Sequence, residues 1–427
     1  MIVSLRDAVA STSGGKAATL GALLRVGLPV PDGFVIPFDV YRAAVRGDGR
    51  DMTAGGIGAH PLPAGLFDAL APALRGLGDV SVAVRSSAAG EDTVHASGAG
   101  QHESVLAVRS VEDVAAAVLT CWDSLHSSRA IAYRSDPGDD HLLDGPVMAV
   151  LVQRLVDAEV SGVMFTPSGS EGATEIEASW GLGPSVVGGT VTPDAYRVAA
   201  DGSVTRTVSD KRTRLDRDGA PFATGLVTRD VPTVDRDRPT LDGATVARLA
   251  RLGHEVAALL GRPQDIEWAI AGEHVWVLQA RPVTAAPPPA PSGAPVPFGA
   301  VLTGTPASHG TATGTARIVH GPADFARVRP GDILVCPYTD PAWTPLLRVA
   351  AGVVTEIGGV LSHAAIIARE LRIPAVLGIP DATTTIPDGA HVTIDGTTGT
   401  IRHSSPWQDA AGTSCSTALR PTCTQLG

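Results

Sequence analysis

The stretch AGVVTEIGGVLSHAAIIAREL, residues 351–371, decides the fold of the C-terminal part of the chain. Its first six residues are rich in valine, which predicts a buried strand. A glycine-led loop follows at 358–363, and the apolar spacing of 364–371 predicts a short helix. Further segments predict strands on either side, namely 331–337, 373–378 and 391–401. We therefore expect a small α/β domain, which we place at residues 299–402.

His363 is the residue of this stretch with the most chemical potential. It begins the expected helix, whose N-terminus favours an anionic adduct on the imidazole. Gly358 and Gly359 leave room for a bulky triphosphate to approach. An imidazole can act as a nucleophile and hold a covalent intermediate. A helix-capping or core histidine fits the same pattern, so the residues alone leave both readings open.

A proline-rich segment separates this domain from the rest of the chain. Six prolines fall between Pro287 and Pro297, which is typical of an extended, semi-rigid linker. We place the linker at 286–298 and a first region at 1–285. After residue 402 the sequence loses its periodicity, and we read 403–427 as a loose tail.

The first region mixes helix and strand patterns. Apolar spacing predicts helices at 17–26 and 242–261, the second with Gly261 as its end. Segments 80–87 and 146–156 are valine-rich and strand-like, and two later segments, 160–167 and 174–181, could pair with them. A β-hairpin is expected at 264–283. This order fits an α+β enzyme, and no GxGxxG follows a first strand as a Rossmann fold would need.

The hairpin carries a possible metal and phosphate site. Asp265 and Glu267 lie two apart on one strand and share a face, as do Gln279 and Arg281 on the next. A carboxylate and a carboxamide on adjacent strands can bind a magnesium ion that bridges nucleotide phosphates. The planar fork of Arg281 can hold a phosphate. A surface hairpin with a salt bridge explains the same residues.

A loop after the expected strand at 80–87 is rich in small residues. The strand ends at Arg85, and Gly98, Gly100 and Gln101 follow in the loop. Small residues let backbone N–H groups approach phosphate oxygens closely, so these residues are candidates for ATP binding. Flexible surface loops look similar.

The chain holds two lysines, Lys16 and Lys211, among its 33 basic residues. Gly14 and Gly15 precede Lys16 and lead into a helix, which together make a plausible anion site. The P-loop spacing GxxxxGK[ST] is missing there.

Composition excludes several classes of partner. The formal charge of −11 and the absence of a long basic run argue against nucleic-acid binding. The N-terminus lacks a signal-peptide pattern, and no apolar run reaches membrane-spanning length. The spacing of the cysteines matches no metal cluster and favours a reduced, cytoplasmic protein. The cysteines are Cys121, Cys336, Cys415 and Cys423.

Several motifs, taken in one order, resemble those of a known family. The segment 339–378 is similar to the swivelling phosphohistidine domain of phosphoenolpyruvate synthase, pyruvate phosphate dikinase and rifampicin phosphotransferase. The N-terminal motifs look like the ATP-binding region of the same proteins. They are GGKAATLGALLRVGLPVPDGFVI (14–36), AVRSSAAGEDTVHASGAGQHES (83–104), VSGVMFTP (160–167), SWGLGPSVVGGTVTPD (179–194), QDIEWAI (264–270) and LQARPVT (278–284). The resemblance covers about 1–285 and 299–402.

The resemblance implies a two-lobed ATP-grasp fold for the first region and a dikinase type of chemistry. ATP would donate a pyrophosphoryl group to His363 and leave as AMP, and the remaining phosphohistidine would serve an acceptor. By position, Glu267 and Gln279 match the magnesium-binding pair. Lys16, Arg85 and Arg281 match phosphate-binding residues, and Lys211 falls in a region near the nucleotide.

This sequence departs from the family pattern in its acceptor region. The relatives carry a pyruvate-binding barrel or a large acceptor domain, and here the two parts are joined by the proline-rich segment alone. We therefore expect a small-molecule acceptor, phosphorylated at a hydroxyl and held at the domain interface, and not pyruvate. One alternative is a phosphocarrier subunit that delivers to a separate acceptor-binding protein. Others are an ATP-grasp ligase, which releases ADP and needs no histidine, and a nucleotide-binding regulator without activity.

Overall fold

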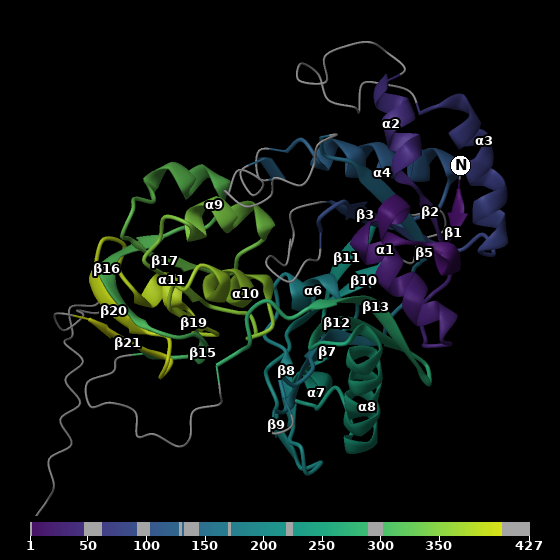
Figure 1. The fold of residues 1–427 in the computed structure, drawn as a ribbon. Helices are drawn as coiled ribbons and strands as arrows, with labels where there is room; N and C mark the ends of the chain where they lie inside the picture. The colour runs from purple at the N-terminus through teal and green to yellow at the C-terminus, as the bar shows by residue number, and fades with distance from the viewer. Residues whose placement is uncertain are drawn as a thin grey trace, which may run out of the picture.

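The structure is a computed structural model that describes residues 2–46, 62–91, 103–127, 130–131, 145–169, 172–218, 225–288 and 302–403. Its elements form an α+β fold built on three main sheets and a small hairpin. Two of the sheets belong to the N-terminal region and one to the C-terminal region. Figure 1 shows the C-terminal sheet as a separate body beside the other two.

The first sheet is antiparallel and has five strands in the order β1-β2-β5-β3-β4. Its central strands are apolar and buried along nearly their whole length, which agrees with their runs of valine. The strands are β1 (Val3–Ser4), β2 (Gly33–Ile36), β3 (Val82–Ala88), β4 (Ser104–Val108) and β5 (Met148–Arg154). The accompanying helices are η1 (Leu5–Asp7), α1 (Ala10–Arg25), α2 (Phe38–Arg46), α3 (Ala64–Gly76) and α4 (Val111–Ser124).

The second sheet is also antiparallel, with six strands in the order β13-β12-β6-β7-β8-β9. One apolar core joins it to the first sheet, so the two form the lobes of one body. Its strands are β6 (Val160–Phe165), β7 (Thr174–Trp180), β8 (Asp194–Val198), β9 (Val204–Thr207), β12 (Gln264–Ala271) and β13 (His274–Pro282). Beside it lie α6 (Pro184–Val187), β10 (Thr213–Arg217), β11 (Leu226–Asp230), α7 (Thr233–Arg236) and α8 (Gly243–Leu260).

Helix α8 shows how local sequence sets these boundaries. The side chain of Asp242 caps the helix by accepting a hydrogen bond from the N–H of Thr245 at 2.8 Å. Gly261 ends it with a φ of 73°, a left-handed conformation that suits glycine. Apolar residues on one face, among them Val246 and Leu249, are buried against the second sheet. The predicted helix at 242–261 is therefore confirmed.

The third sheet has eight strands in the order β14-β21-β20-β16-β17-β18-β19-β15, and its centre is parallel. Separate apolar clusters cover its two faces. Its strands are β14 (Leu302–Thr303), β15 (Thr305–Ser308), β16 (Thr311–Ile318), β17 (Ile333–Cys336), β18 (Gly352–Thr355), β19 (Ala375–Leu377), β20 (His391–Asp395) and β21 (Thr400–His403). Its helices are η3 (Pro322–Arg327), η4 (Pro341–Trp343), α9 (Thr344–Leu347), α10 (His363–Glu370) and α11 (Ala382–Thr385).

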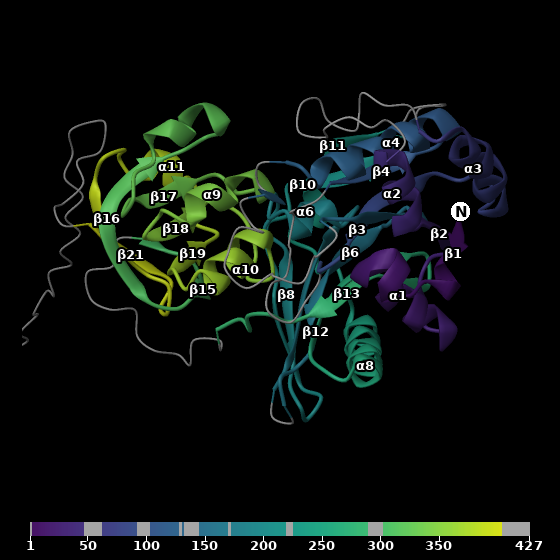
Figure 2. The same cartoon turned by 45° about the horizontal axis from the view of Figure 1, so that its top comes forward.

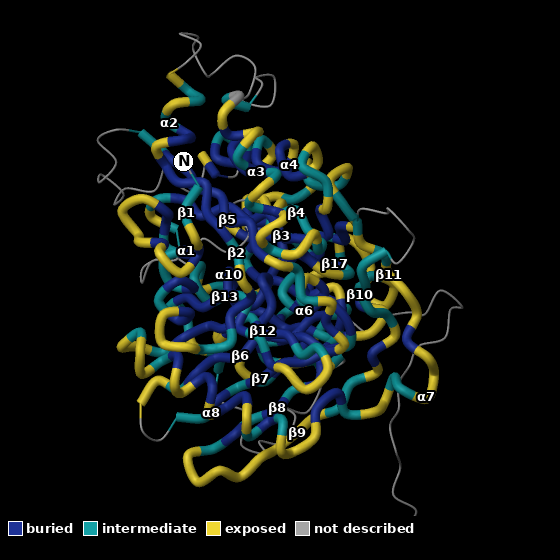
Figure 3. Tube along the Cα trace, turned by 90° about the vertical axis from the view of Figure 1, so that its right-hand side faces the viewer, coloured by how far each residue is buried: buried dark blue, intermediate teal, exposed yellow. Residues whose placement is uncertain are grey.

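The α10 side of the third sheet faces the second sheet (Figures 1 and 2). A small apolar cluster joins the two bodies there. It contains Leu361 and Ile366 from the C-terminal region and Val163, Phe165, Val186 and Val191 from the N-terminal region. Figure 3 shows that the strands at the centre of the first two sheets are the most buried part of the chain in that view. The loop before α10 is therefore placed beside the N-terminal lobes.

The structure corrects two details of the sequence reading. The strand segments 80–87 and 146–156 pair with each other, and so do 160–167 and 174–181, but the two pairs lie in different sheets. Apolar runs show that strands are buried without showing which sheet they join. The helix expected at 17–26 begins earlier, at Ala10, and bends at Gly14.

Some boundaries stay predictions. Most of the predicted linker, and all of the predicted tail beyond His403, lie outside the described residues. Cys415 and Cys423 lie there as well, whereas Cys121 and Cys336 are buried and form no disulfide. None of the helices in the described ranges has the length and apolarity needed to cross a bilayer.

Candidate active site

A cavity of about 410 Å³ lies where the two N-terminal lobes meet the C-terminal body. The first lobe contributes side chains from α1 and β3, the second contributes β12 and β13, and α10 contributes His363 and Ile366. Predicted site residues from all three parts line the cavity, namely Lys16, Arg85, Glu267, Gln279, Arg281 and His363. Segments up to 347 residues apart in the sequence therefore share one site.

The β12–β13 hairpin places its polar residues in register. Glu267 lies directly opposite Gln279, and Asp265 lies opposite Arg281. The Nε of Arg281 donates to Asp265 Oδ2 at 2.8 Å, and both side chains are buried. Burial raises the pKa of Asp265, and the charge of Arg281 opposes that effect. The expected salt bridge exists, but it lies inside the protein and holds the arginine at the cavity wall.

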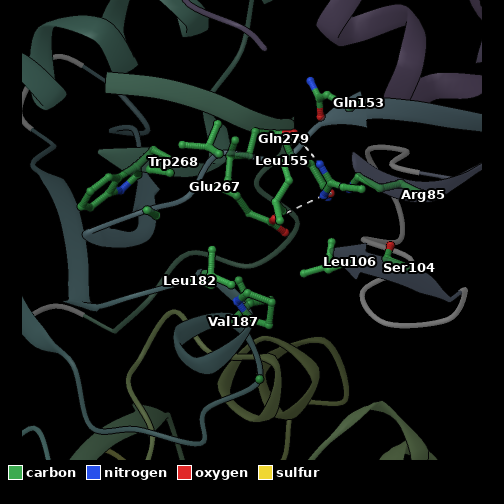
Figure 4. Close-up of a pocket in the computed structure, with 18 of the residues that line it drawn as sticks. Arg85, Ser104, Leu106, Gln153, Leu155, Leu182, Val187, Glu267, Trp268 and Gln279 are labelled. Carbon is green, nitrogen blue, oxygen red and sulfur yellow. Dashed lines mark hydrogen bonds and ion pairs between the residues drawn. The ribbon is translucent and has the colours of Figure 1, made fainter. Parts of the chain in front are cut away.

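Arg85 organises the other pair of the hairpin. Its Nη2 donates to Gln279 Oε1 at 2.6 Å and to Glu267 Oε2 at 3.3 Å, while Nη1 donates to the carbonyl of Leu278 at 2.5 Å. Figure 4 shows the guanidinium reaching across the cavity from β3 to both side chains. Arg85 thus aligns a carboxylate oxygen and a carboxamide oxygen on the same side of the cavity.

Lys16 enters the cavity from a bend in α1. Gly14, at the bend, has a φ of 77°, and a Cβ there would lie 2.3 Å from the carbonyl oxygen of Ser87. Only glycine permits that close approach. The Nζ of Lys16 donates to the carbonyl of Ser86 at 2.9 Å and to Glu91 Oε1 at 2.8 Å. Because of this bend, the part of α1 that follows Gly14 packs against β3 and brings Lys16 with it.

His363 completes the site from the other body. It is the first residue of α10 and is 3 % exposed, yet it lines the cavity. Its Nε2 lies 3.4 Å from the hydroxyl of Thr344, which also donates to the carbonyl of Pro341 at 3.0 Å. The ring is therefore held in place beside the cavity and is not part of a closed core.

An apolar wall lies opposite the charged residues. Figure 4 shows Leu182 and Val187 facing the space from the side away from Arg85, whereas Leu155 lies beside the arginine. Further lining residues of this type are Leu106, Val156, Leu226, Trp268 and Ile366. A flat aromatic ring fits between such side chains, while the charged end holds anionic groups. The sequence reading missed this wall, because single apolar residues spread over five elements and the loops after β5 and β7 have no shared local pattern.

The sequence reading also missed Glu91, which lines the cavity and binds Lys16. Its signal was weak, since it stands in a loop of small residues.

Lys211 is placed elsewhere. Its side chain is fully buried, and its Nζ donates to Asp194 Oδ1 at 2.6 Å and to the carbonyl of Ser209 at 2.8 Å. Gly98, Gly100 and Gln101 lie outside the described residues.

The residues present suit a magnesium ion that is shared with a ligand. Within the described ranges, no cluster of three or more His, Cys, Asp or Glu side chains could hold a metal alone. Glu267 and Gln279 offer one carboxylate and one carboxamide oxygen side by side. Mg²⁺ is commonly bound through one or two carboxylates together with phosphate oxygens and water. A metal at this position would therefore take its other ligands from a phosphate chain.

Comparison with known proteins gives consistent matches. Residues 53–295 match the family model of the pyruvate phosphate dikinase AMP/ATP-binding domain, and residues 328–399 match the mobile domain of PEP-utilising enzymes. The phosphoenolpyruvate synthase of Aeropyrum pernix is 37% identical, with 91% of this chain and 56% of the relative covered. A probable phosphoenolpyruvate synthase of Methanothermobacter thermautotrophicus is 36% identical (91% and 61%), and the Escherichia coli phosphoenolpyruvate synthase is 35% identical (91% and 55%). The chain spans little more than half the length of these relatives.

Proposed function

Because the chain belongs to the phosphoenolpyruvate synthase and pyruvate phosphate dikinase family, we propose that it is an ATP-dependent phosphotransferase that works through phosphorylated His363. One observation carries the proposal. His363, from the mobile-domain match, lines the same cavity as Arg85 and Arg281, from the AMP/ATP-binding match, and as Lys16 of α1. A nucleophile and a set of cations thus converge on one space large enough for part of a nucleotide.

The proposed first step is attack by an imidazole nitrogen of His363 on the β-phosphorus of ATP. The bond from that phosphorus to the bridging oxygen of the α-phosphate breaks, and AMP leaves with the electron pair. Water or inorganic phosphate then attacks the terminal phosphorus of the pyrophosphoryl group on His363, the bond from that phosphorus to the bridging oxygen breaks, and a phosphohistidine remains. Arg85, Arg281 and Lys16 line the cavity, and we propose that they position the phosphate chain and balance its charge.

Magnesium is part of the proposal. Glu267 and Gln279 would hold it, and bound metal would neutralise charge that develops on the phosphate oxygens. Arg85 already orients both side chains through hydrogen bonds at 3.3 Å and 2.6 Å. The apolar wall at Leu182, Val187 and Trp268 would receive the adenine. We leave Lys211 out of the proposed site, because its ammonium is enclosed with Asp194.

The test is mass spectrometry of the purified protein after treatment with ATP, together with quantification of AMP. We expect a phosphoryl adduct on the peptide that contains His363, labelled by β-³²P ATP, and AMP in at least equal amount. His363→Ala removes both. His391→Ala is the matched control, because His391 is an exposed histidine on β20 of the same body. Adduct formation or AMP release that survives in His363→Ala contradicts the proposal, and release of ADP in place of AMP favours a ligase.

We further propose that the acceptor is a small molecule phosphorylated at a hydroxyl, and that the protein works in the cytoplasm. The alternative is delivery to an acceptor domain on a separate protein. The two differ in the fate of the charged protein. Phosphohistidine that decays in the purified protein when small hydroxyl compounds are added supports the first, whereas phosphohistidine that persists until a second protein is added supports the alternative.

A further inference from the structure

Glu177 connects the second sheet to the loop that carries His363. It lies on β7 and is 3 % exposed. Its Oε1 accepts a hydrogen bond from the N–H of Val360 at 2.6 Å, and its Oε2 accepts one from the N–H of Leu361 at 3.2 Å. Both donors belong to the loop directly before His363. The carboxylate therefore binds the backbone of the other body through both of its oxygens.

Gly359 is shaped to this carboxylate. A Cβ at Gly359 would lie 2.2 Å from Oε2 of Glu177 and 2.5 Å from its Oε1. No real Cβ tolerates such distances, so the side chain must be absent while the carboxylate is seated. The φ of Gly359 lies outside the left-handed region, so the backbone itself accepts any residue. The glycine is thus required by the contact with Glu177 and not by the turn.

The contact is enclosed by groups from both bodies. Leu361 and Ile366 pack with the apolar cluster of the second lobe, which keeps water away from the hydrogen bonds. Arg369 of α10 donates to the carbonyl of Val360 at 2.7 Å and to that of Ala285 at 3.2 Å. Ala285 lies in the N-terminal region just before the proline-rich segment. Arg369 therefore braces the same loop from its other side.

We propose that Glu177 is the docking residue that seats the His363 loop at the nucleotide cavity, by capturing the Val360 and Leu361 amides over a glycine that leaves room for it. Glu177 does not line the cavity. It is a positioning residue, which acts on His363 through the loop. Its role in catalysis rests on the proposed function, whereas the docking contact can be measured without any nucleotide.

The charge of Glu177 makes this docking sensitive to protons. Burial raises the pKa of Glu177 to about 7, and the two backbone hydrogen bonds and the charge of Arg369 oppose this rise. The other charged group that acts on it is Glu175, which is paired with Arg197 of β8. When the loop leaves, the Glu177 carboxyl becomes exposed and loses the proton that it holds in the docked state near pH 7. Docking and proton uptake are therefore coupled.

The test combines two substitutions and measures the docked state directly. Hydrogen–deuterium exchange reports protection of the Val360 and Leu361 amides, and small-angle X-ray scattering reports separation of the two bodies, both without nucleotide. We expect Glu177→Ala to speed exchange of these amides at least about tenfold, because each loses a charged acceptor. Glu175→Ala is the matched control on the same strand, since its partner Arg197 lies in the same sheet. It should leave the exchange unchanged.

The second substitution tests the shape of the contact. Gly359→Ala should speed exchange and expand the scattering profile, because its Cβ collides with the carboxylate. In the Glu177→Ala background the same change should add nothing further, since the colliding group is gone. Exchange that is unaffected by Glu177→Ala, or a Gly359→Ala effect of equal size in both backgrounds, overturns the proposal. If Glu177→Ala does not fold, Gly359→Ala decides alone, and a compact protein with protected amides refutes the contact.

The outcome is separable from that of the proposed function. A protein that never forms phosphohistidine but shows the expected exchange pattern contradicts the proposed function and keeps the docking residue. If His363 is phosphorylated and neither its rate of phosphorylation nor the amide exchange depends on Glu177, the proposed function is kept and the docking residue is contradicted. Where both hold, the Glu177→Ala variant should charge His363 at least about tenfold more slowly at equal ATP. Profiles of that rate against pH should lose the step near pH 7.

Discussion

Docking of the His363 loop should weaken as the pH rises, because Glu177 enters the interface more easily when it is protonated. The pKa of Glu177 is raised from 4.5 to about 7, chiefly by burial. A difference of one in pKa corresponds to about 1.36 kcal/mol. The difference between 4.5 and about 7 therefore means that keeping Glu177 ionised in the docked state costs about 3 kcal/mol. The raised pKa belongs to the docked state. The contribution of Glu177 protonation to the free energy of docking is therefore complete below pH 4.5, and it is lost as the pH rises through 7.

This gives a measurable slope. If the carboxyl of the undocked protein has its ordinary pKa, the ratio of docked to undocked molecules should fall about tenfold between pH 6 and pH 8. The ratio can be followed by small-angle X-ray scattering, or by energy transfer between a dye on each body. Glu177→Gln keeps the size of the side chain and cannot ionise, so its ratio should change much less over the same range. The comparison of the two proteins removes the contribution of every other titrating group, because those groups are the same in both.

Two results would refute the reasoning. A docked fraction that rises with pH would mean that the hydrogen bonds to Val360 and Leu361 outweigh burial and that the pKa of Glu177 is lowered. An equal slope in Glu177→Gln would assign the proton to a group other than Glu177. A titration of the Glu177 carboxyl by carbon-detected NMR would separate these cases, because it reads the pKa of that side chain alone.

Three further predictions concern the cavity and the buried lysine. Arg85→Lys should lower AMP formation by about a hundredfold without changing the circular dichroism spectrum, because an ammonium cannot hold Gln279, Glu267 and a carbonyl in one plane. Glu267→Gln should impair labelling of His363 by β-³²P ATP and leave the fold intact, and unchanged labelling would count against its metal role. Lys211→Met should reduce the free energy of unfolding by about 3–5 kcal/mol in urea titrations, because it leaves Asp194 buried without its partner. A loss of nucleotide affinity at unchanged stability would return Lys211 to the ATP site.

Elements whose boundaries are set by local chemistry could be predicted from the sequence. The end of α8 at Gly261 and the β12–β13 hairpin follow from a left-handed cap and from alternating side chains. Two-residue spacing puts Asp265 and Glu267 on one face of β12, and Gln279 and Arg281 on one face of β13, and the hairpin makes the two strands neighbours. These predictions needed only neighbouring residues.

Relations between distant segments could not be predicted in the same way. Nothing in TEIEASWG marks Glu177 as a partner of a loop 183 residues later, because the contact is made to backbone amides that every residue carries. Lys211 shows the same limit, because its partner Asp194 could not be predicted from neighbouring residues either. An isolated lysine looked suited to a phosphate, and only its burial against Asp194 shows that its charge is already matched.

The interface around His363 has to satisfy two opposing needs if the proposed function holds. The imidazole must be placed within reach of the nucleotide, and the same loop must then leave to meet an acceptor. A purely apolar interface would gain affinity with every buried side chain and would release slowly. Here the apolar cluster at Leu361 and Ile366 is small, and a carboxylate is buried with it. The hydrogen bonds of Glu177 fix where the loop docks, while the cost of burying its charge limits how tightly it docks. The hydrogen bonds thus set the position of the loop, and the cost of burying the charge sets its affinity. This division suits a group that must be both accurately placed and readily released.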